Sequence, residues 1–263
     1  MFQAYLYSGV AALSLALALP AHAQVTAKPT ASAFAELAKL PDFGGVWEVT
    51  RGPAPAAGGG NAARPAAPEP PSLTPKYAEK LAAYRAHPPQ DSSAANCVPA
   101  GMPGVMSQPY PLEFILSPGK VTVIAEAYMQ VRHIYTDGRP HPEDPDLTFN
   151  GHSIGHWENG KSGDKDTLVV DSIGFSPLTS LGPGTEHSDK MHIVERMRLS
   201  TPDNLEIVTT VDDKEALTKP FTRTANFGRH RDWVTAEYIC QENNRNSVDE
   251  TGKAGINLKV EGK

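Results

Sequence analysis

Residues 190–212 read KMHIVERMRLSTPDNLEIVTTVD, two runs of alternating apolar and polar residues joined by a turn sequence. In the first run every second residue from Met191 to Leu199 is apolar except Glu195, which is the period of a β-strand with one buried face. The linking Thr201-Pro202-Asp203-Asn204 is typical of a turn, because proline and Asx side chains favour chain reversals. The stretch therefore predicts an antiparallel hairpin.

The same period of two continues through most of the chain from Leu112 onward, with clusters of Gly, Pro, Asp or Asn between the runs. No helical period intervenes, so the chain offers no crossover helices for parallel strands. These features predict an all-β fold of about nine antiparallel strands in up-and-down order, closed into a barrel that leaves no free edge. The expected strands are 112–116, 120–128, 129–135, 153–158, 166–171, 190–199, 204–212, 220–227 and 232–240.

Helical and irregular segments precede these strands. Apolar residues at helical spacing in 24–41 predict a short N-terminal helix region, which leads to a first strand within 42–49. A second helix is expected at 74–86, where a threonine and a proline supply its N-terminal signals. Residues 52–72 are almost all Gly, Pro and Ala, a composition that buries too little surface to order itself. We therefore expect one domain, 24–263, with a flexible insertion at 52–72.

The first residues predict the compartment. Leu6 to Pro20 form an apolar run, and Ala21-His22-Ala23 follows as a small-x-small cleavage signal, so residues 1–23 are expected to be a cleaved signal peptide. A membrane anchor is the alternative, since Met1 to Tyr5 carry no Lys or Arg, but the run is shorter than the roughly 20 residues of a spanning helix. We expect a periplasmic protein without a membrane span after cleavage.

Charge and cysteine content narrow the partners further. The formal net charge is -6 and the pI is about 5.8, with no basic run, which argues against nucleic acid and anionic membrane surfaces as partners. Cys97 and Cys240 are the only cysteines, and an even pair in an oxidising compartment predicts a disulfide. A reactive thiol is the alternative.

Several motifs carry a resemblance to known families. Gly45-Val46-Trp47 resembles the G-x-W signature of lipocalin-like barrels, in which the tryptophan plugs the closed end. Residues 95–245 resemble a large family of uncharacterised secreted bacterial proteins, common in soil and aromatic-degrading bacteria; Asn159 to Gly163 lengthens a turn that is usually tight there. That resemblance implies a secreted protein and no assigned catalytic residue. Its motifs are DGRPHP (137–142), GHSIGHWE (151–158), DTLVVD (166–171) and HSDKMHIVER (187–196).

Glu195 is a carboxylate on an otherwise apolar strand face. A buried carboxylate is costly unless it is paired or hydrogen-bonded, and burial raises its pKa toward a range useful for acid–base chemistry. Three interpretations stay open: an ion pair with Arg132 or Arg139, a catalytic group that faces a ligand, or a different register that turns Glu195 to solvent.

Strand 129–135 poses a related question, because either of its faces could point inward. With one face inside, His133 and Tyr135 enter a cavity as a proton-transfer pair. With the other face inside, Arg132 enters instead and can hold a carboxylate. A half-buried histidine satisfied by structural contacts is the plainer alternative for His133.

Loop residues supply further candidates. Arg139 and His141 lie in a proline-stiffened segment and could line the mouth of a cavity, and His152 stands beside Gly151, where a substrate could approach its ring closely. His192 and Trp157 complete the residues expected to contact a substrate. Ordinary loop polarity is the alternative for the loop positions.

The sequence has no well-spaced motif for binding a metal or a cofactor. His152 and His156 are four residues apart, but on a strand they lie about 13 Å from each other, too far to share an ion. No phosphate-binding glycine loop, nucleophile elbow or C-x-x-C occurs. We expect no cofactor and no metal ligands; a divalent metal held by histidines from several strands is the alternative.

Two functional hypotheses follow. The first is a cofactor-independent enzyme of lyase or isomerase type, with Glu195, His133, His152 and Tyr135 as catalytic residues and a hydrophobic small molecule as substrate. The habitat of the resembling family suggests a lignin-derived aromatic compound. The second is a non-catalytic, lipocalin-like protein that binds a small molecule, which needs the same cavity but no acid–base pair.

Overall fold

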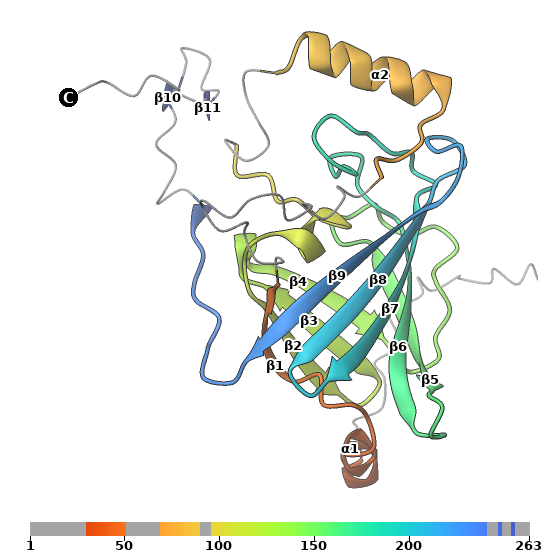
Figure 1. Cartoon of the computed structure of the whole chain (residues 1–263), viewed down its shortest axis with the longest axis vertical. Coiled ribbons are helices and arrows are strands. Elements are labelled where there is room, and N and C mark those ends of the chain that lie inside the picture. The colour runs from red at the N-terminus through yellow and green to blue at the C-terminus, as the bar shows by residue number, and fades with distance from the viewer. Residues whose placement is uncertain (1–29, 51–68, 90–95, 241–246, 249–253, 256–263) are drawn as a thin grey trace, which may run out of the picture.

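The computed structural model describes residues 30–50, 69–89, 96–240, 247–248 and 254–255. The expected signal peptide 1–23 and residues 52–68 of the expected insertion lie outside them. At the centre is a closed barrel in which the strands follow one another in sequence order (Figure 1). The barrel strands are β1 (Gly45–Val49), β2 (Leu112–Ser117), β3 (Lys120–Ala125), β4 (Gln130–Tyr135), β5 (His152–Asn159), β6 (Lys165–Ile173), β7 (His192–Thr201), β8 (Asn204–Asp212) and β9 (Phe221–His230).

The all-β barrel is thus confirmed, but its up-and-down order fails at one step. Every neighbouring pair is antiparallel except β4 and β5, which run parallel through Ile134↔Ser153 and Tyr135↔Ile154. A parallel connection must return along the length of the strand, which takes a dozen or more residues. Residues 136–151 are long enough to do so without a helix.

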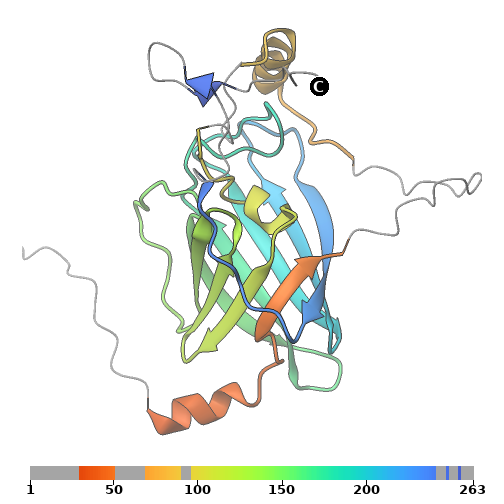
Figure 2. The same cartoon turned by 90° about the vertical axis from the view of Figure 1, so that its left-hand side faces the viewer.

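The last expected strand, 232–240, is also wrong. The barrel is already closed by the pairing of β1 with β9, so no free edge remains for another strand. Instead, residues 231–240 run along the outside of the barrel (Figure 2). The Thr235 hydroxyl donates to Glu113 at 3.0 Å and the Ala236 N–H donates to Glu126 at 2.9 Å. The expected disulfide between Cys97 and Cys240 is present and fastens the end of this segment.

Two helices lie at opposite ends of the barrel (Figure 1). They are α1 (Ala31–Leu37) and α2 (Pro75–Ala86), with short 3₁₀ turns η1 (Gly104–Ser107) and η2 (Ala127–Met129) and a small ladder of β10 (Ser247–Val248) with β11 (Ala254–Gly255). The expected strand 120–128 stops at Ala125, because Tyr128 and Met129 adopt positive φ angles of 59° and 48° that turn the chain. Within the described residues no helix combines the length and apolarity needed to cross a membrane.

Apolar side chains from all nine strands pack together inside the barrel. Trp47 of β1 is fully buried, and its indole N–H donates to the Phe43 carbonyl at 2.9 Å. The Arg229 guanidinium lies 4.4 Å from the centre of the Trp47 ring and pairs with Asp42. The cavity along the inner face of β8 and β9 measures only about 20 Å³, which holds about one water molecule.

Candidate functional site

A group of titratable side chains lies on the outer wall of the barrel. His152 of β5, Asp171 of β6 and His192 of β7 come from three adjacent strands and are part-exposed. Because side chains alternate along a strand, the residues that follow them point inward. Those inward residues are all fully buried: Ser153, Ser172 and Ile193.

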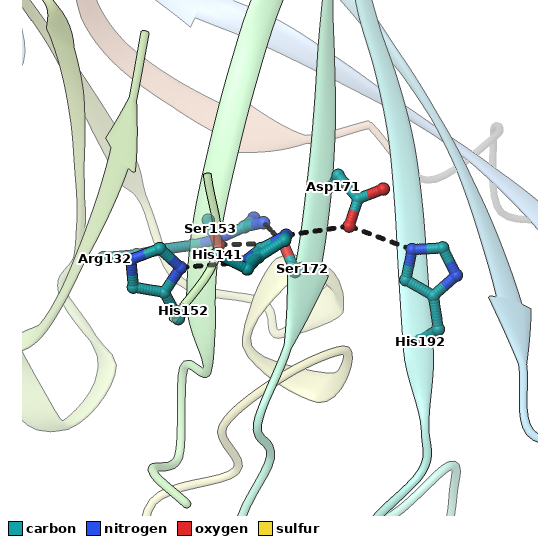
Figure 3. A network of polar contacts seen from close by, with 7 residues as sticks. All are labelled: Arg132, His141, His152, Ser153, Asp171, Ser172 and His192. Carbon is teal, nitrogen blue, oxygen red and sulfur yellow. Dashed lines mark hydrogen bonds and ion pairs between the residues drawn. The ribbon is translucent and has the colours of Figure 1, made fainter. Parts of the chain in front are cut away.

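His141 comes from the 136–151 connection and completes this group, which we call the histidine relay: Asp171, His141, His152 and His192 (Figure 3). His141 Nε2 lies 3.0 Å from Asp171 Oδ1, and His141 Nδ1 lies 2.8 Å from His152 Nδ1. His192 Nε2 approaches the same Asp171 oxygen at 2.9 Å. Asp171 therefore lies between two imidazole rings, and a third ring lies behind His141.

The hydrogen bonds of the relay dictate its tautomers. An ionised carboxylate can only accept, so His141 donates to Asp171 through Nε2. A neutral His141 then has a lone pair on Nδ1, and it must accept the Nδ1–H of His152. A neutral His152 consequently has its remaining lone pair on Nε2. That atom forms no hydrogen bond within the described residues. The relay therefore presents His152 Nε2 as a proton acceptor.

The surroundings keep His152 neutral. Burial lowers the pKa of His152, and the Arg139 guanidinium lowers it further. Burial and the Lys120 ammonium lower the pKa of His133 in the same way. Both rings are therefore bases at neutral pH.

A cavity of about 250 Å³ lies beside the relay, where β4 and β5 separate. Its lining comes from both strands and from the end of their connection, and includes His133, Tyr135, Phe149 and His152. The Tyr135 ring stacks on His152 with 5.6 Å between ring centres and lies 6.4 Å from His133. We call this cavity the outer pocket.

Arg139 covers the same tyrosine from the connection. Its guanidinium carbon is 3.9 Å from the centre of the Tyr135 ring. The guanidinium also donates three hydrogen bonds to the Asp137 carboxylate, at 2.9, 3.1 and 2.6 Å, and this pairing holds the pKa of the Asp137 carboxyl below its usual value. The pair fixes the turn at Gly138, whose φ of 83° suits glycine.

Glu195 and Arg132 lie inside the barrel, away from the relay. Glu195 is 0% exposed and Arg132 3%, and the two form an ion pair. Arg132 also donates to Ser153 at 3.2 Å and to Ser172 at 3.0 Å, and the two serine hydroxyls are 2.8 Å apart. These serines directly follow His152 and Asp171 in sequence, so the inner hydrogen bonds tie together the same two strands that position the relay outside (Figure 3).

The structure decides two alternatives that the sequence left open. On β4 the Arg132 face points inward, so His133 and Tyr135 lie outside the barrel and not in its interior. The partner of Glu195 is Arg132, whereas Arg139 lies outside with Tyr135 and Asp137. Residues Met129 and Val131, which alternate with the inward residues, are 43% and 46% exposed.

The remaining predicted residues divide between two places. His141, His152 and His192 come together in the relay, and Arg139 lies above the outer pocket. Trp157 does not join them. Its ring contacts Phe43 with 5.3 Å between ring centres, and it lines a different cavity of about 520 Å³ between α1 and the barrel end.

Asp171 and Lys120 are site residues that the sequence analysis missed. Asp171 ends the DTLVVD motif directly after a buried apolar run, so a carboxylate at the end of such a run was the available signal. Lys120 gives no such signal, because only the pairing of β3 with β4 places it opposite Tyr135.

Within the described ranges no group of three or more His, Cys, Asp or Glu side chains is arranged to hold a metal ion. His156, the other histidine of β5, faces Glu158 at 3.5 Å and takes no part in the relay. The contacts among the relay residues are at hydrogen-bond distances.

Comparison with known proteins gives no match, either to a protein-family model or to a curated protein. The resemblance to secreted bacterial proteins therefore stays a prediction from motifs. All four of those motifs supply relay residues: DGRPHP supplies His141, GHSIGHWE supplies His152, DTLVVD supplies Asp171 and HSDKMHIVER supplies His192.

Proposed function

We propose that this protein is an enzyme that moves protons on a small hydrophobic molecule in the outer pocket, with His152 as its general base. The observation that carries the proposal is the chain of contacts from Asp171 through His141 to His152, at 3.0 and 2.8 Å. A base that is hydrogen-bonded to a second group, which is itself oriented by a carboxylate, is a recurrent arrangement for activating proton transfer.

The relay can accept and return one proton. A substrate X–H group gives its proton to His152 Nε2, and the Nδ1 proton of His152 passes to His141 Nδ1. His141 then carries the positive charge, and its Nε2–H remains hydrogen-bonded to the Asp171 carboxylate. The negative charge of Asp171 stabilises the His141 imidazolium. Reversal of these transfers returns the proton to the product at another atom. The net result is an isomerase- or lyase-type reaction that draws on side chains alone.

In the lyase case, His152 takes the proton of a substrate hydroxyl. The O–H electron pair forms a carbonyl, the adjacent C–C bond breaks, and the carbon that receives the electron pair takes the proton back from the relay. A lignin-derived aromatic compound is the substrate we propose for this step. Aromatic side chains support it, since Tyr135 and Phe149 line the outer pocket.

We also propose that the chain is exported and works in the periplasm. The Cys97–Cys240 disulfide supports an oxidising compartment, because structural disulfides persist there and are rare in the cytosol. The apolar run and small-x-small signal in residues 1–23 support export through a cleaved signal peptide.

A screen of small molecules with the purified mature protein tests the proposed activity and its pH dependence. Because the pKa of His152 lies below its ordinary value of 6.5, the base form persists through neutral pH, and kcat/KM should fall only as the pH drops below 6.5. Turnover is followed by mass spectrometry with and without a chelator. A decline that begins above 6.5, or loss of turnover with the chelator, contradicts a neutral His152 base acting without a metal.

A lipocalin-like binding protein is the second candidate. The 520 Å³ cavity under α1 favours it, because Leu37, Leu116 and Trp157 give that cavity apolar walls of the kind that hold small ligands. Binding that depends on Trp157, with no turnover of any bound compound, would favour this candidate over the enzyme.

A further inference from the structure

We infer that the outer pocket takes a small organic anion, a carboxylate on a body of about one aromatic ring. The inference rests on the proposed function, because it concerns the molecule on which His152 acts. It names a chemical class that the relay alone does not specify. Three features of the pocket carry it: its walls, its charge and its size.

The walls combine flat apolar surfaces with polar groups at one side. Tyr135 and Phe149 give aromatic faces, and Thr148 and Asn150 add a hydroxyl and an amide. The Asn150 amide is already committed, since it donates to the Val131 carbonyl at 3.1 Å and accepts from Gln130 at 3.1 Å. The polar groups left free in the lining therefore include the Thr148 hydroxyl and the His133 and His152 rings.

A lysine ammonium lies beside the pocket, although the whole chain is acidic. None of the residues that line the pocket is Asp or Glu. Lys120 lies opposite Tyr135 in the β3–β4 ladder and shares its outward face. Its ammonium forms no ion pair within the part of the chain that the structure describes, and it lies near enough to His133 to lower the pKa of that ring.

Two nearby carboxylates already have hydrogen-bond partners. Asp137 is held by both donors of the Arg139 fork. Asp171 accepts hydrogen bonds from His141 and His192. It lies on the far side of His141 from His152 (Figure 3). Lys120, which lies opposite Tyr135 and near His133, has no ionic partner among the described residues, and a carboxylate bound beside it would supply one.

The size of the pocket limits the body of the anion. A volume of about 250 Å³ is below the range of roughly 300–1,000 Å³ that encloses drug-sized ligands. One ring with a carboxylate suits this space. An anion bound there also favours the protonated form of His152 once the base has taken a proton, because the opposite charge stabilises the imidazolium.

Binding of benzoate and of its neutral analogue benzamide to the mature protein tests the inference. We expect benzoate to bind about fivefold more tightly than benzamide at low salt, as one solvent-exposed ion pair allows. The preference should shrink in high salt, which screens exposed charges. It should vanish in Lys120→Met and persist in the control Lys214→Met, an exposed lysine in the loop after β8. Benzoate should also raise the pKa of His152, measured by NMR titration.

Equal binding of the two probes, or the same preference in both lysine variants, overturns the inference. The outcomes separate it from the proposed function. Turnover that depends on His152 without a preference for benzoate keeps the enzyme and rejects the anion. If benzoate binds preferentially but no turnover depends on His152, the inference of an anion site holds and the proposed enzyme is rejected. The outer pocket is then a binding site and not an active site.

Discussion

Replacing His152 with glutamine should lower turnover by about 10²- to 10⁴-fold, the usual contribution of a general base. Glutamine is close to histidine in size and can still donate a hydrogen bond to His141, but it cannot take up a proton. Ligand affinity should change little, because the aromatic walls of the outer pocket stay in place. Steady-state kinetics on a compound from the screen, with ligand binding measured by calorimetry, separates the two effects.

His156→Gln is the matched control for this substitution. His156 lies on the same strand and the same outer face, four residues further along, and its side chain is 67% exposed beside Glu158. It should leave turnover and binding unchanged. If His152→Gln and His156→Gln have equal kinetic effects, the relay has no catalytic role.

Replacing Glu195 with glutamine should lower the free energy of unfolding by about 3–5 kcal/mol, because it leaves the buried Arg132 guanidinium without a counter-charge. Among the described residues, one Arg132 nitrogen and one Glu195 oxygen already have no hydrogen-bond partner, so no spare contact can replace the lost ion pair. Urea unfolding followed by tryptophan fluorescence measures the change.

Glu158→Gln provides the comparison for that loss. Glu158 also pairs with an arginine, Arg196, but both side chains are 40% exposed or more, so its loss should cost far less stability than the loss of Glu195. The double variant Arg132→Met/Glu195→Leu should regain part of the loss of Glu195→Gln, since apolar replacement of a buried pair is often nearly neutral. Similar stability for Glu195→Gln and Glu158→Gln would show that the buried charge is tolerated unpaired.

Much of the fold follows from local patterns. The hairpin of β7 and β8 matches its expected strands to within two residues, because the alternation and the Thr-Pro-Asp-Asn turn are both local signals. The sequence did not predict the parallel pairing of β4 with β5, because residues 136–151 show no regular hydrophobic pattern that would indicate a crossover connection. Residues 232–240 have strand-like composition, but the closed barrel offers them no edge.

The site was only partly predictable for a different reason. His141, His152 and His192 could be listed from the sequence, but their association depends on the connection 136–151 folding back onto β5 and β6. Asp171 joins them only through strand pairing. Glu195 was recognised as a buried carboxylate, and its alternatives included the Arg132 pair that the structure contains. The substitution that best separates an enzyme from a binding protein is accordingly His152→Gln and not Glu195→Gln.

The tautomers of His141 and His152 decide whether His152 Nε2 can act as the general base, and measuring them needs no substrate. Long-range ¹H–¹⁵N spectra of the labelled mature protein at neutral pH report which ring nitrogen carries the proton, with signals assigned through His→Gln variants. We expect a proton on Nε2 of His141 and on Nδ1 of His152, with His152 Nε2 unprotonated. A proton on Nε2 of His152, or a charged His152 ring at neutral pH, would contradict it.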